Sequence, residues 1–146
     1  MVAQGLDKLG YQYVNMDDCW SATSRDSNGQ LQVHCPPLTV PSPLFSRHRQ
    51  PDPKRFPLGM KELADYVHSK GLKIGLYTCV GTLTCKFGRP GSYGHFDDDA
   101  RTLAAWGIDF VKADNCHHAP GTDTRELYTN FSRALNATGR PMYDLE

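Results

Sequence analysis

Segments typical of strands alternate along this chain with segments of helical periodicity, and this alternation limits the possible folds more than any other feature. In one helical segment, Met60, Leu63, Ala64 and Val67 recur at positions i, i+3, i+4 and i+7. Strands are predicted over 11–16, 72–77 and 110–113 and from 139–141 onward, and helices over 2–9, from 57–59 to 70–71, over 95–106 and over 124–135. Such alternation predicts a parallel sheet whose strands are joined by helical crossovers.

Polar side chains that are unusual in strands occur where three successive predicted strands end: Asp17 and Asp18, then Tyr77, then Lys112 with Asp114. An α/β barrel builds its active site from this end of its strands. An open doubly wound sheet also binds ligands at strand ends, but at one crevice, and no Gly-x-Gly-x-x-Gly loop follows any predicted strand. We therefore expect an α/β fold of the (β/α)8 TIM barrel type.

The length of the chain limits how much of a barrel it can form. A complete barrel takes about 200–250 residues or more, whereas this chain has 146. We expect a partial barrel of about four βα units with parallel strands, forming one domain over residues 1–146. Residues 33–50 are rich in proline, serine and leucine and lack any period, which indicates an insertion, either a translated intron or a surface loop. On either interpretation Cys35 has no native partner.

Lys112 and Asp114 lie two residues apart at the end of the predicted strand 110–113, so their side chains project to the same side. Burying a lysine and a carboxylate at the end of an apolar strand costs free energy unless the two groups interact with each other. The ammonium favours the ionised carboxylate and lowers its pKa. Asp114 is therefore suited to act as a nucleophile or to stabilise a cation. A structural ion pair at a strand end is the alternative that these two residues leave open.

Composition argues against several function classes. Lys and Arg number 16 and are balanced by 16 Asp and Glu, so no basic excess points to nucleic acid. No apolar run approaches the roughly 18–20 residues of a membrane span, and the N-terminus lacks the regions of a signal peptide. Five cysteines and two glycosylation sequons, at Asn130 and Asn136, favour an oxidising compartment, although each sequon can arise by chance.

His117 and His118 invite a metal-binding interpretation. Two adjacent histidines without suitably spaced acidic or cysteine partners make a poor metal site. We therefore expect an exposed loop at this position and no metal.

Four runs, taken in order along the chain, resemble the α-galactosidases of glycoside hydrolase family 27, also called melibiases. They are Tyr13-Val14-Asn15-Met16-Asp17-Asp18-Cys19-Trp20, the stretch from 51–57 through 71–77, Pro90-Gly91-Ser92-Tyr93-Gly94-His95, and Lys112-Ala113-Asp114-Asn115-Cys116. The resemblance covers nearly the whole chain apart from residues 33–50. It implies a retaining hydrolase of terminal α-D-galactosyl residues in galactosides, oligosaccharides or glycolipids, which works through a covalent glycosyl-Asp intermediate and needs no cofactor.

The resemblance implies a role for each polar residue at the strand ends. Asp114 matches the nucleophile, and Lys112 matches a residue that hydrogen-bonds sugar hydroxyls. Asp17 and Asp18 match a pair that accepts hydrogen bonds from the 4- and 6-hydroxyls of galactose, a task for which anionic acceptors are well suited. A helix cap or a pair of calcium ligands is the alternative for these two aspartates.

Two aromatic residues and three cysteines also match family positions. Trp20 and Tyr77 match aromatic and phenolic neighbours of the sugar, whereas without the resemblance both are ordinary aromatics at the edge of a core. Cys85 and Cys116 match a disulfide that joins the loops after two successive strands. Cys19 matches a half-cystine whose partner lies before Met1, and Cys79 receives no role.

The resemblance places the acid/base carboxyl, and the strand that reads the sugar's 2-substituent, beyond Glu146. We therefore expect the 146-residue chain alone to be inactive, and a non-catalytic remnant with at most weak sugar binding is the second function class. Within the enzyme class, α-N-acetylgalactosaminidase is the rival substrate interpretation. The expected partner is an α-galactoside carbohydrate, with no nucleic acid and no membrane, and a homodimer is left open for the full-length enzyme. The implied location is secreted or lysosomal/vacuolar.

Overall fold

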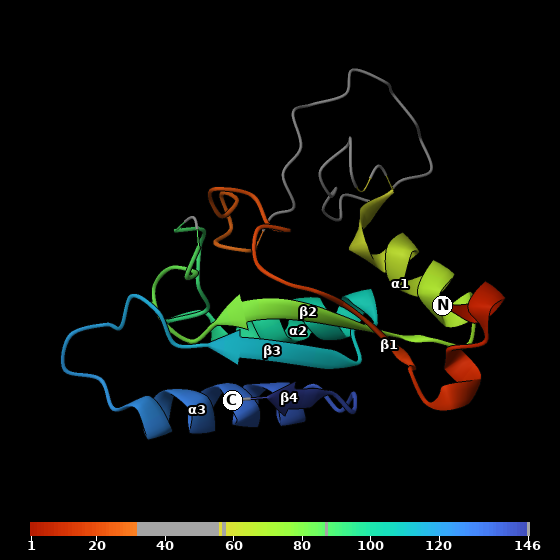
Figure 1. The fold of residues 1–146 in the computed structure, drawn as a ribbon. Coiled ribbons are helices and arrows are strands. Elements are labelled where there is room, and N and C mark those ends of the chain that lie inside the picture. The colour runs from red at the N-terminus through yellow and green to blue at the C-terminus, as the bar shows by residue number, and fades with distance from the viewer. Residues whose placement is uncertain (32–55, 57, 87, 146) are drawn as a thin grey trace, which may run out of the picture.

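A computed structural model of the chain describes residues 1–31, 56, 58–86 and 88–145. Within these residues it forms a four-stranded, fully parallel sheet in the order β1-β2-β3-β4 (Figure 1). The strands and helices are β1 (Tyr13–Met16), α1 (Gly59–Ser69), β2 (Lys73–Cys79), α2 (Phe96–Trp106), β3 (Phe110–Asp114), α3 (Thr124–Ala137) and β4 (Tyr143–Leu145). The predicted alternation of strands and helices is confirmed. Most strand ends shift by one or two residues, and the last strand begins at Tyr143, two to four residues later than predicted. The predicted insertion at 33–50 lies outside the described residues.

The predicted N-terminal helix is wrong. Residues Val2–Gln4 and Asp7–Leu9 form two short 3-10 helices instead. Gly5 ends the first at φ 70° and Gly10 ends the second at φ 93°. This left-handed backbone suits glycine and interrupts the helical hydrogen-bond ladder, so the apolar spacing across Gly5 does not belong to one helix.

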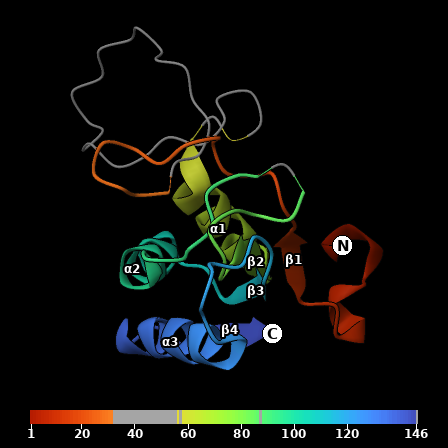
Figure 2. The same ribbon diagram turned by 90° about the vertical axis from the view of Figure 1, so that its left-hand side faces the viewer.

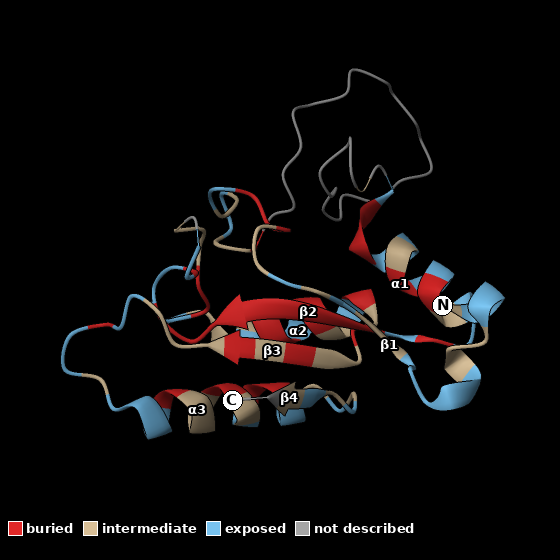
Figure 3. Cartoon of the chain, in the orientation of Figure 1, coloured by how far each residue is buried: buried red, intermediate tan, exposed pale blue. Residues whose placement is uncertain are grey.

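The three α-helices all cover one face of the sheet (Figure 2). On that face Ile74, Val111 and Ala113 are almost completely buried. Figure 3 colours β2 as mostly buried, whereas β3 alternates between buried and intermediate residues. Residues between them in sequence, such as Phe110 and the two charged residues of β3, point to the opposite face and are half-buried. The sheet therefore has a packed outer face and an uncovered inner face, as in one sector of an α/β barrel.

Local signals in the sequence explain where the helices begin. The carboxylate of Asp123 accepts the backbone N–H of Glu126 at 3.1 Å and thereby caps the N-terminus of α3. The first turn of α2 carries three aspartates, which interact favourably with the positive end of the helix dipole.

The two predicted glycosylation sequons both lie in α3, where Asn136 is exposed and Asn130 is half-buried. No helix among the described residues is long and apolar enough to cross a membrane.

The strand register brings distant polar residues to one edge of the sheet. β1 pairs with β2 up to Met16 and Leu76, so the chain leaves β1 at Asp17. In the β2–β3 ladder, Tyr77 stands opposite Lys112, and Cys79 stands opposite Asp114. The polar positions singled out by sequence therefore lie at the same C-terminal edge.

Candidate active site

A hollow of about 440 Å³ opens on the inner face of the sheet near this edge. Three of the residues predicted for the site, Asp17, Lys112 and Asp114, line it. Sequence reasoning missed two other lining residues, Asn15 and Phe110. The signal that could have found them is strand alternation, because each precedes a predicted site residue by two positions and shares its face. The remaining lining residues are Met16 and Leu76.

Lys112 stands between two carboxyl groups. Its ammonium nitrogen lies 3.0 Å from Oδ2 of Asp17 and 3.9 Å from Oδ2 of Asp114. The predicted Lys112–Asp114 pair is therefore present, but the hydrogen-bonded partner is Asp17, from the end of β1. The hydrogen bond from Lys112 lowers the pKa of Asp17, and the same bond raises the pKa of Lys112. Both groups thus stay charged across the physiological pH range.

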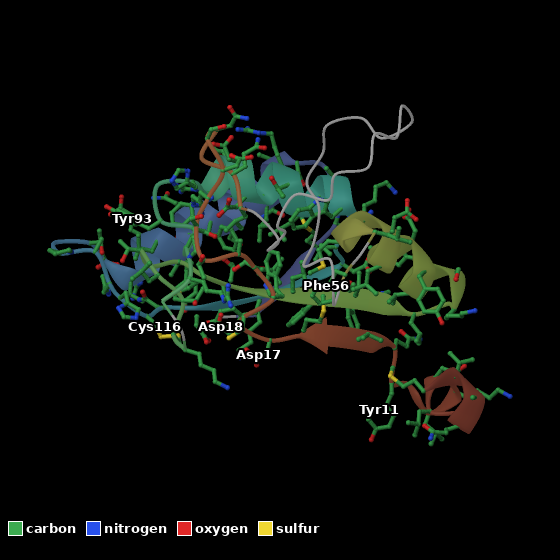
Figure 4. All side chains as sticks on the ribbon, turned by 90° about the horizontal axis from the view of Figure 1, so that it is seen from above. Tyr11, Asp17, Asp18, Phe56, Tyr93 and Cys116 are labelled. Carbon is green, nitrogen blue, oxygen red and sulfur yellow. A yellow bond between two sulfur atoms is a disulfide. The ribbon has the colours of Figure 1, made fainter. Side chains whose placement is uncertain are left out.

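Asp18 is held by backbone N–H groups. Its Oδ1 accepts the N–H of Cys19 at 2.6 Å, and its Oδ2 accepts the N–H of Lys86 at 2.9 Å. Cys19 adopts φ 78°, so the chain turns sharply directly after Asp18. The N–H of Asp18 in turn binds Oδ1 of Asp17 at 2.8 Å. Figure 4 shows the two aspartates side by side, with Cys116 at the same end of the sheet.

The predicted disulfide between Cys85 and Cys116 is confirmed, with 5.1 Å between the two Cα atoms. It joins the loop after β2 to the loop after β3. Sγ of Cys85 lies 3.5 Å from Oδ2 of Asp114, and because a disulfide sulfur carries no hydrogen, this is a contact without proton donation. The disulfide therefore forms one wall beside the carboxyl group of Asp114.

Tyr77 lies under the same loop and is 2% exposed. Its hydroxyl oxygen accepts the N–H of Cys85 at 3.4 Å, and the ammonium of Lys112 lies 5.1 Å from its ring centre. Burial raises the pKa of Tyr77 well above its usual range, and the neighbouring carboxylate of Asp114 adds to this. Tyr77 is thus a neutral hydrogen-bonding group next to Lys112 and Asp114.

Trp20 does not line the hollow. Its side chain is 5% exposed, its indole N–H donates to the carbonyl oxygen of Tyr77 at 2.7 Å, and its ring packs edge-on against Trp106 at 5.8 Å. The structure therefore places Trp20 behind Tyr77, where it supports the end of β2.

His117, His118 and Cys79 are not among the residues that line the hollow. His117 and His118 are exposed in the loop after β3, as predicted. No group of three or more metal-ligating side chains occurs in the part of the chain that the structure describes. The buried thiol sulfur of Cys79 accepts the N–H of Cys116 at 3.1 Å, and burial raises its pKa. Cys35 lies outside the described residues.

Comparison with known proteins shows to which family this chain belongs. The family model Melibiase_2, described as alpha galactosidase A, matches residues 1–43 and 45–145. The chain belongs to this family. Alpha-galactosidase 2 of Arabidopsis thaliana is 46% identical over 143 residues, which are 98% of this chain and 31% of the relative. Alpha-galactosidase A of Homo sapiens is 45% identical over 140 residues, which are 96% of this chain and 28% of the relative.

Solved structures agree with the family assignment. Alpha-galactosidase I from Mortierella vinacea superposes with a TM-score of 0.77 at 42% identity, over 96% of this chain and 32% of that one. An alpha-galactosidase from Saccharomyces cerevisiae with raffinose gives a TM-score of 0.76 at 35% identity, over 96% of this chain and 27% of that one. This melibiase-family chain thus spans about a third of the length of its relatives, and its sheet is part of an α/β barrel.

Proposed function

We propose that this chain provides the nucleophile side of a retaining α-galactosidase, which hydrolyses terminal α-D-galactosyl residues of galactosides, oligosaccharides or glycolipids. One observation carries the proposal: the ammonium of Lys112 lies within 4 Å of the carboxyl groups of both Asp17 and Asp114, beside an open hollow. Sugar-hydroxyl acceptors and a nucleophile are thereby brought together around one cation.

In the proposed reaction, a carboxylate oxygen of Asp114 attacks the anomeric carbon of the galactoside. A new C–O bond forms to Asp114 while the bond to the leaving-group oxygen breaks, and that oxygen takes a proton from a second carboxyl group. Water then hydrolyses the glycosyl-Asp114 ester with the second group acting as base. In a retaining enzyme the two carboxyl groups lie about 5–5.5 Å apart.

The neighbouring groups bind and orient the sugar. Asp17 and Asp18 offer anionic oxygens to hydroxyl donors, and charge-assisted hydrogen bonds of this kind are strong. The ammonium of Lys112 donates to sugar oxygens from between Asp17 and Asp114. Tyr77 provides a neutral hydroxyl, and Trp20 acts through Tyr77 because its indole N–H holds that residue's carbonyl group.

The second carboxyl group is expected beyond Glu146, so we propose that the 146-residue chain by itself does not hydrolyse galactosides measurably. One catalytic group rarely suffices where both leaving-group protonation and attack are needed. An aryl α-galactoside assay of the purified chain checks this. Turnover that Asp114→Asn abolishes would show that a described residue supplies the acid.

The nucleophile is tested in a chimera in which this chain replaces the aligned segment of the Cyamopsis tetragonoloba alpha-galactosidase, which is 44% identical over 143 residues. A fluorinated α-galactosyl inactivator followed by peptide mapping should label Asp114. The Asp114→Asn chimera is the matched control and should take no label. A label on Asp17, Asp18 or another carboxylate contradicts the assignment.

α-N-Acetylgalactosaminidase activity is the second candidate. The alpha-N-acetylgalactosaminidase of Gallus gallus is 43% identical over 139 residues, nearly as similar as the α-galactosidases. Assaying the chimera cannot separate the two activities, because the strand expected to select the sugar's 2-substituent would come from the Cyamopsis tetragonoloba enzyme. The discriminating assay therefore uses the longest natural reading frame containing this chain, with aryl α-galactoside and its 2-acetamido analogue compared directly.

A secreted or lysosomal/vacuolar location is proposed with this function. The disulfide at the site supports an oxidising compartment, where such bonds persist. The exposed sequon at Asn136 in α3 supports N-glycosylation there, and Asn130 is the second proposed acceptor. Peptide mapping before and after deglycosylation of the secreted protein tests both positions.

A further inference from the structure

Residues 85 and 86 contact three predicted site residues, one just after β1, one in β2 and one in β3. The N–H of Lys86 donates to Oδ2 of Asp18 at 2.9 Å, at the end of β1. The N–H of Cys85 donates to the hydroxyl oxygen of Tyr77 at 3.4 Å, in β2. Sγ of Cys85 lies 3.5 Å from Oδ2 of Asp114, in β3. Two consecutive residues thus contact predicted site residues at or near the ends of β1, β2 and β3.

The disulfide anchors this pair of residues. Cys85 and Lys86 are both exposed, so burial does not fix their position, whereas the bond from Cys85 to Cys116 ties them to the loop after β3. The base of the loop is held separately, because the N–H of Thr84 donates to the carbonyl of Arg89 at 2.7 Å and the N–H of Thr82 donates to the carbonyl of His117 at 3.1 Å. Breaking the disulfide would therefore release the tip of the loop and leave its base in place.

We infer that Cys85 and Lys86 form a positioning element, which aligns Asp18, Tyr77 and Asp114 only while the Cys85–Cys116 disulfide is intact. This inference rests on the proposed function for its meaning in sugar binding. Reduction by dithiothreitol adds one hydrogen to each cysteine sulfur, while the two thiols of the reagent become a cyclic disulfide. The thiol of Cys85 then either moves away from Asp114 or donates a hydrogen bond to its carboxylate. Both results change the group that attacks the sugar.

The test uses the oxidised and reduced 146-residue chain and two direct readouts of position. In amide NMR, the Lys86 signal should shift upfield on reduction and exchange its hydrogen faster, because it loses the carboxylate of Asp18. In an alkaline ultraviolet titration, with Tyr77→Phe to identify the signal, Tyr77 should titrate at lower pH after reduction. Lifting the loop exposes the buried hydroxyl group to water, which lowers its pKa, and this outweighs the loss of the N–H donated by Cys85, because burial is the largest cause of the raised pKa. If both readouts stay unchanged on reduction, the inference is wrong.

Two variants separate positioning from general stability. Cys85→Ser combined with Cys116→Ser should reproduce the reduced state without reductant, and dithiothreitol should then change neither readout. Asp109→Asn, at the opposite end of the sheet, is expected to destabilise the fold but to leave the Lys86 and Tyr77 signals as in the wild type. If Asp109→Asn shifts these signals as reduction does, the effect reflects stability and the inference fails.

Titration with methyl α-D-galactoside connects this element to the proposed function. The oxidised chain should bind the sugar about tenfold more tightly than the reduced chain, a difference of about 1.4 kcal/mol. Equal binding in both states would overturn the inference. If neither state binds the sugar, labelling of Asp114 in the chimera decides the proposed function. The Lys86 and Tyr77 signals then decide whether the element positions the site.

Discussion

Oδ2 of Asp17 lies 3.0 Å from the ammonium of Lys112, although the two residues are 95 positions apart. The side chains are 70% and 42% exposed, and an ion pair in such a setting contributes little to stability. Strands β1 and β3 are also not neighbours in the sheet, since β2 runs between them. The lysine side chain therefore reaches across β2 to a partner that stability does not require, which is consistent with a role in ligand binding.

The Asp17–Lys112 ion pair leads to a prediction about the pKa of Asp17. In the wild type the pKa of Asp17 lies below its usual 3.8, chiefly because Lys112 donates a hydrogen bond to it. Lys112→Met removes that donor, so the pKa of Asp17 should rise toward the usual value, as measured by carboxyl carbon NMR during an acid titration. Lys61→Met, which breaks an exposed pair with Asp65, is the control and should leave Asp17 unchanged. A midpoint for Asp17 that is the same in Lys112→Met as in the wild type would contradict the assignment.

The sequence predicted those parts of the fold that depend on local pattern. The spacing of Met60, Leu63, Ala64 and Val67 indicates a helix because it repeats within one element, and α1 confirms it. The end of β2 was less predictable, since Thr78 and Cys79 carry no alternating apolar signal, yet both are buried in the strand. The disulfide was implied only by the family resemblance, because spacing alone does not determine which cysteines pair.

The partners of individual side chains were not predictable in the same way. The bond from Lys112 to Asp17 depends on register and strand order, which local pattern does not supply. The same holds for Asp18, whose link to the N–H of Lys86 joins loops 68 positions apart. Trp20 was assigned to the sugar by resemblance, whereas the structure places it behind Tyr77 in the core. Residue identity thus indicated the site, while the contacts required the folded chain.

A buried ion pair holds the loop after β1 against α2, and breaking it should be costly. Both terminal nitrogens of Arg25 bind the carboxylate of Asp99, at 2.7 and 2.8 Å, and Asp99 is fully buried. Arg25→Met leaves that charge without its cation, so we expect a loss of about 3–5 kcal/mol in the free energy of unfolding, measured by urea denaturation. Arg101→Met breaks an exposed pair with Asp98 and should cost less than about 1 kcal/mol. Similar losses in the two variants would argue against the buried pair.

A further prediction concerns Gly81, where the loop after β2 passes very close to the loop after β3. A Cβ atom added at Gly81 would overlap the backbone carbonyl oxygen of Cys116. Backbone cannot yield as a flexible side chain can, so Gly81→Ala should cost about 3 kcal/mol, at the upper end of the range for overpacking. Gly139→Ala is the control, since its added Cβ meets open space and only the left-handed φ of 74° is penalised, by about 1–2 kcal/mol. Thermal unfolding of both variants compares the two costs, and a smaller loss for Gly81→Ala than for Gly139→Ala would contradict the close approach.

Asp109 should make stability depend on acid pH. Its carboxylate lies 2.7 Å from both His68 Nε2 and an Arg140 nitrogen, and it accepts the N–H of Ile74 at 2.9 Å. Burial alone would raise the pKa of Asp109, but these partners outweigh it and hold the pKa below 3.8. A carboxyl group whose pKa is lower in the folded than in the unfolded state stabilises the fold above the unfolded value, and this contribution disappears as pH falls through the folded value.

Asp109→Asn should therefore cost about 1.5–3 kcal/mol at neutral pH, the range for hydrogen bonds to a charged group. The difference in unfolding free energy between wild type and variant should shrink as the pH falls below about 4, because the wild-type carboxyl then also becomes neutral. Urea denaturation at a series of pH values measures this difference. Asp65→Asn, at an exposed helix position, should show a difference near zero throughout. A gap between wild type and Asp109→Asn that stays constant down to pH values well below the folded pKa would mean that packing, and not the charge of Asp109, stabilises this end of the sheet.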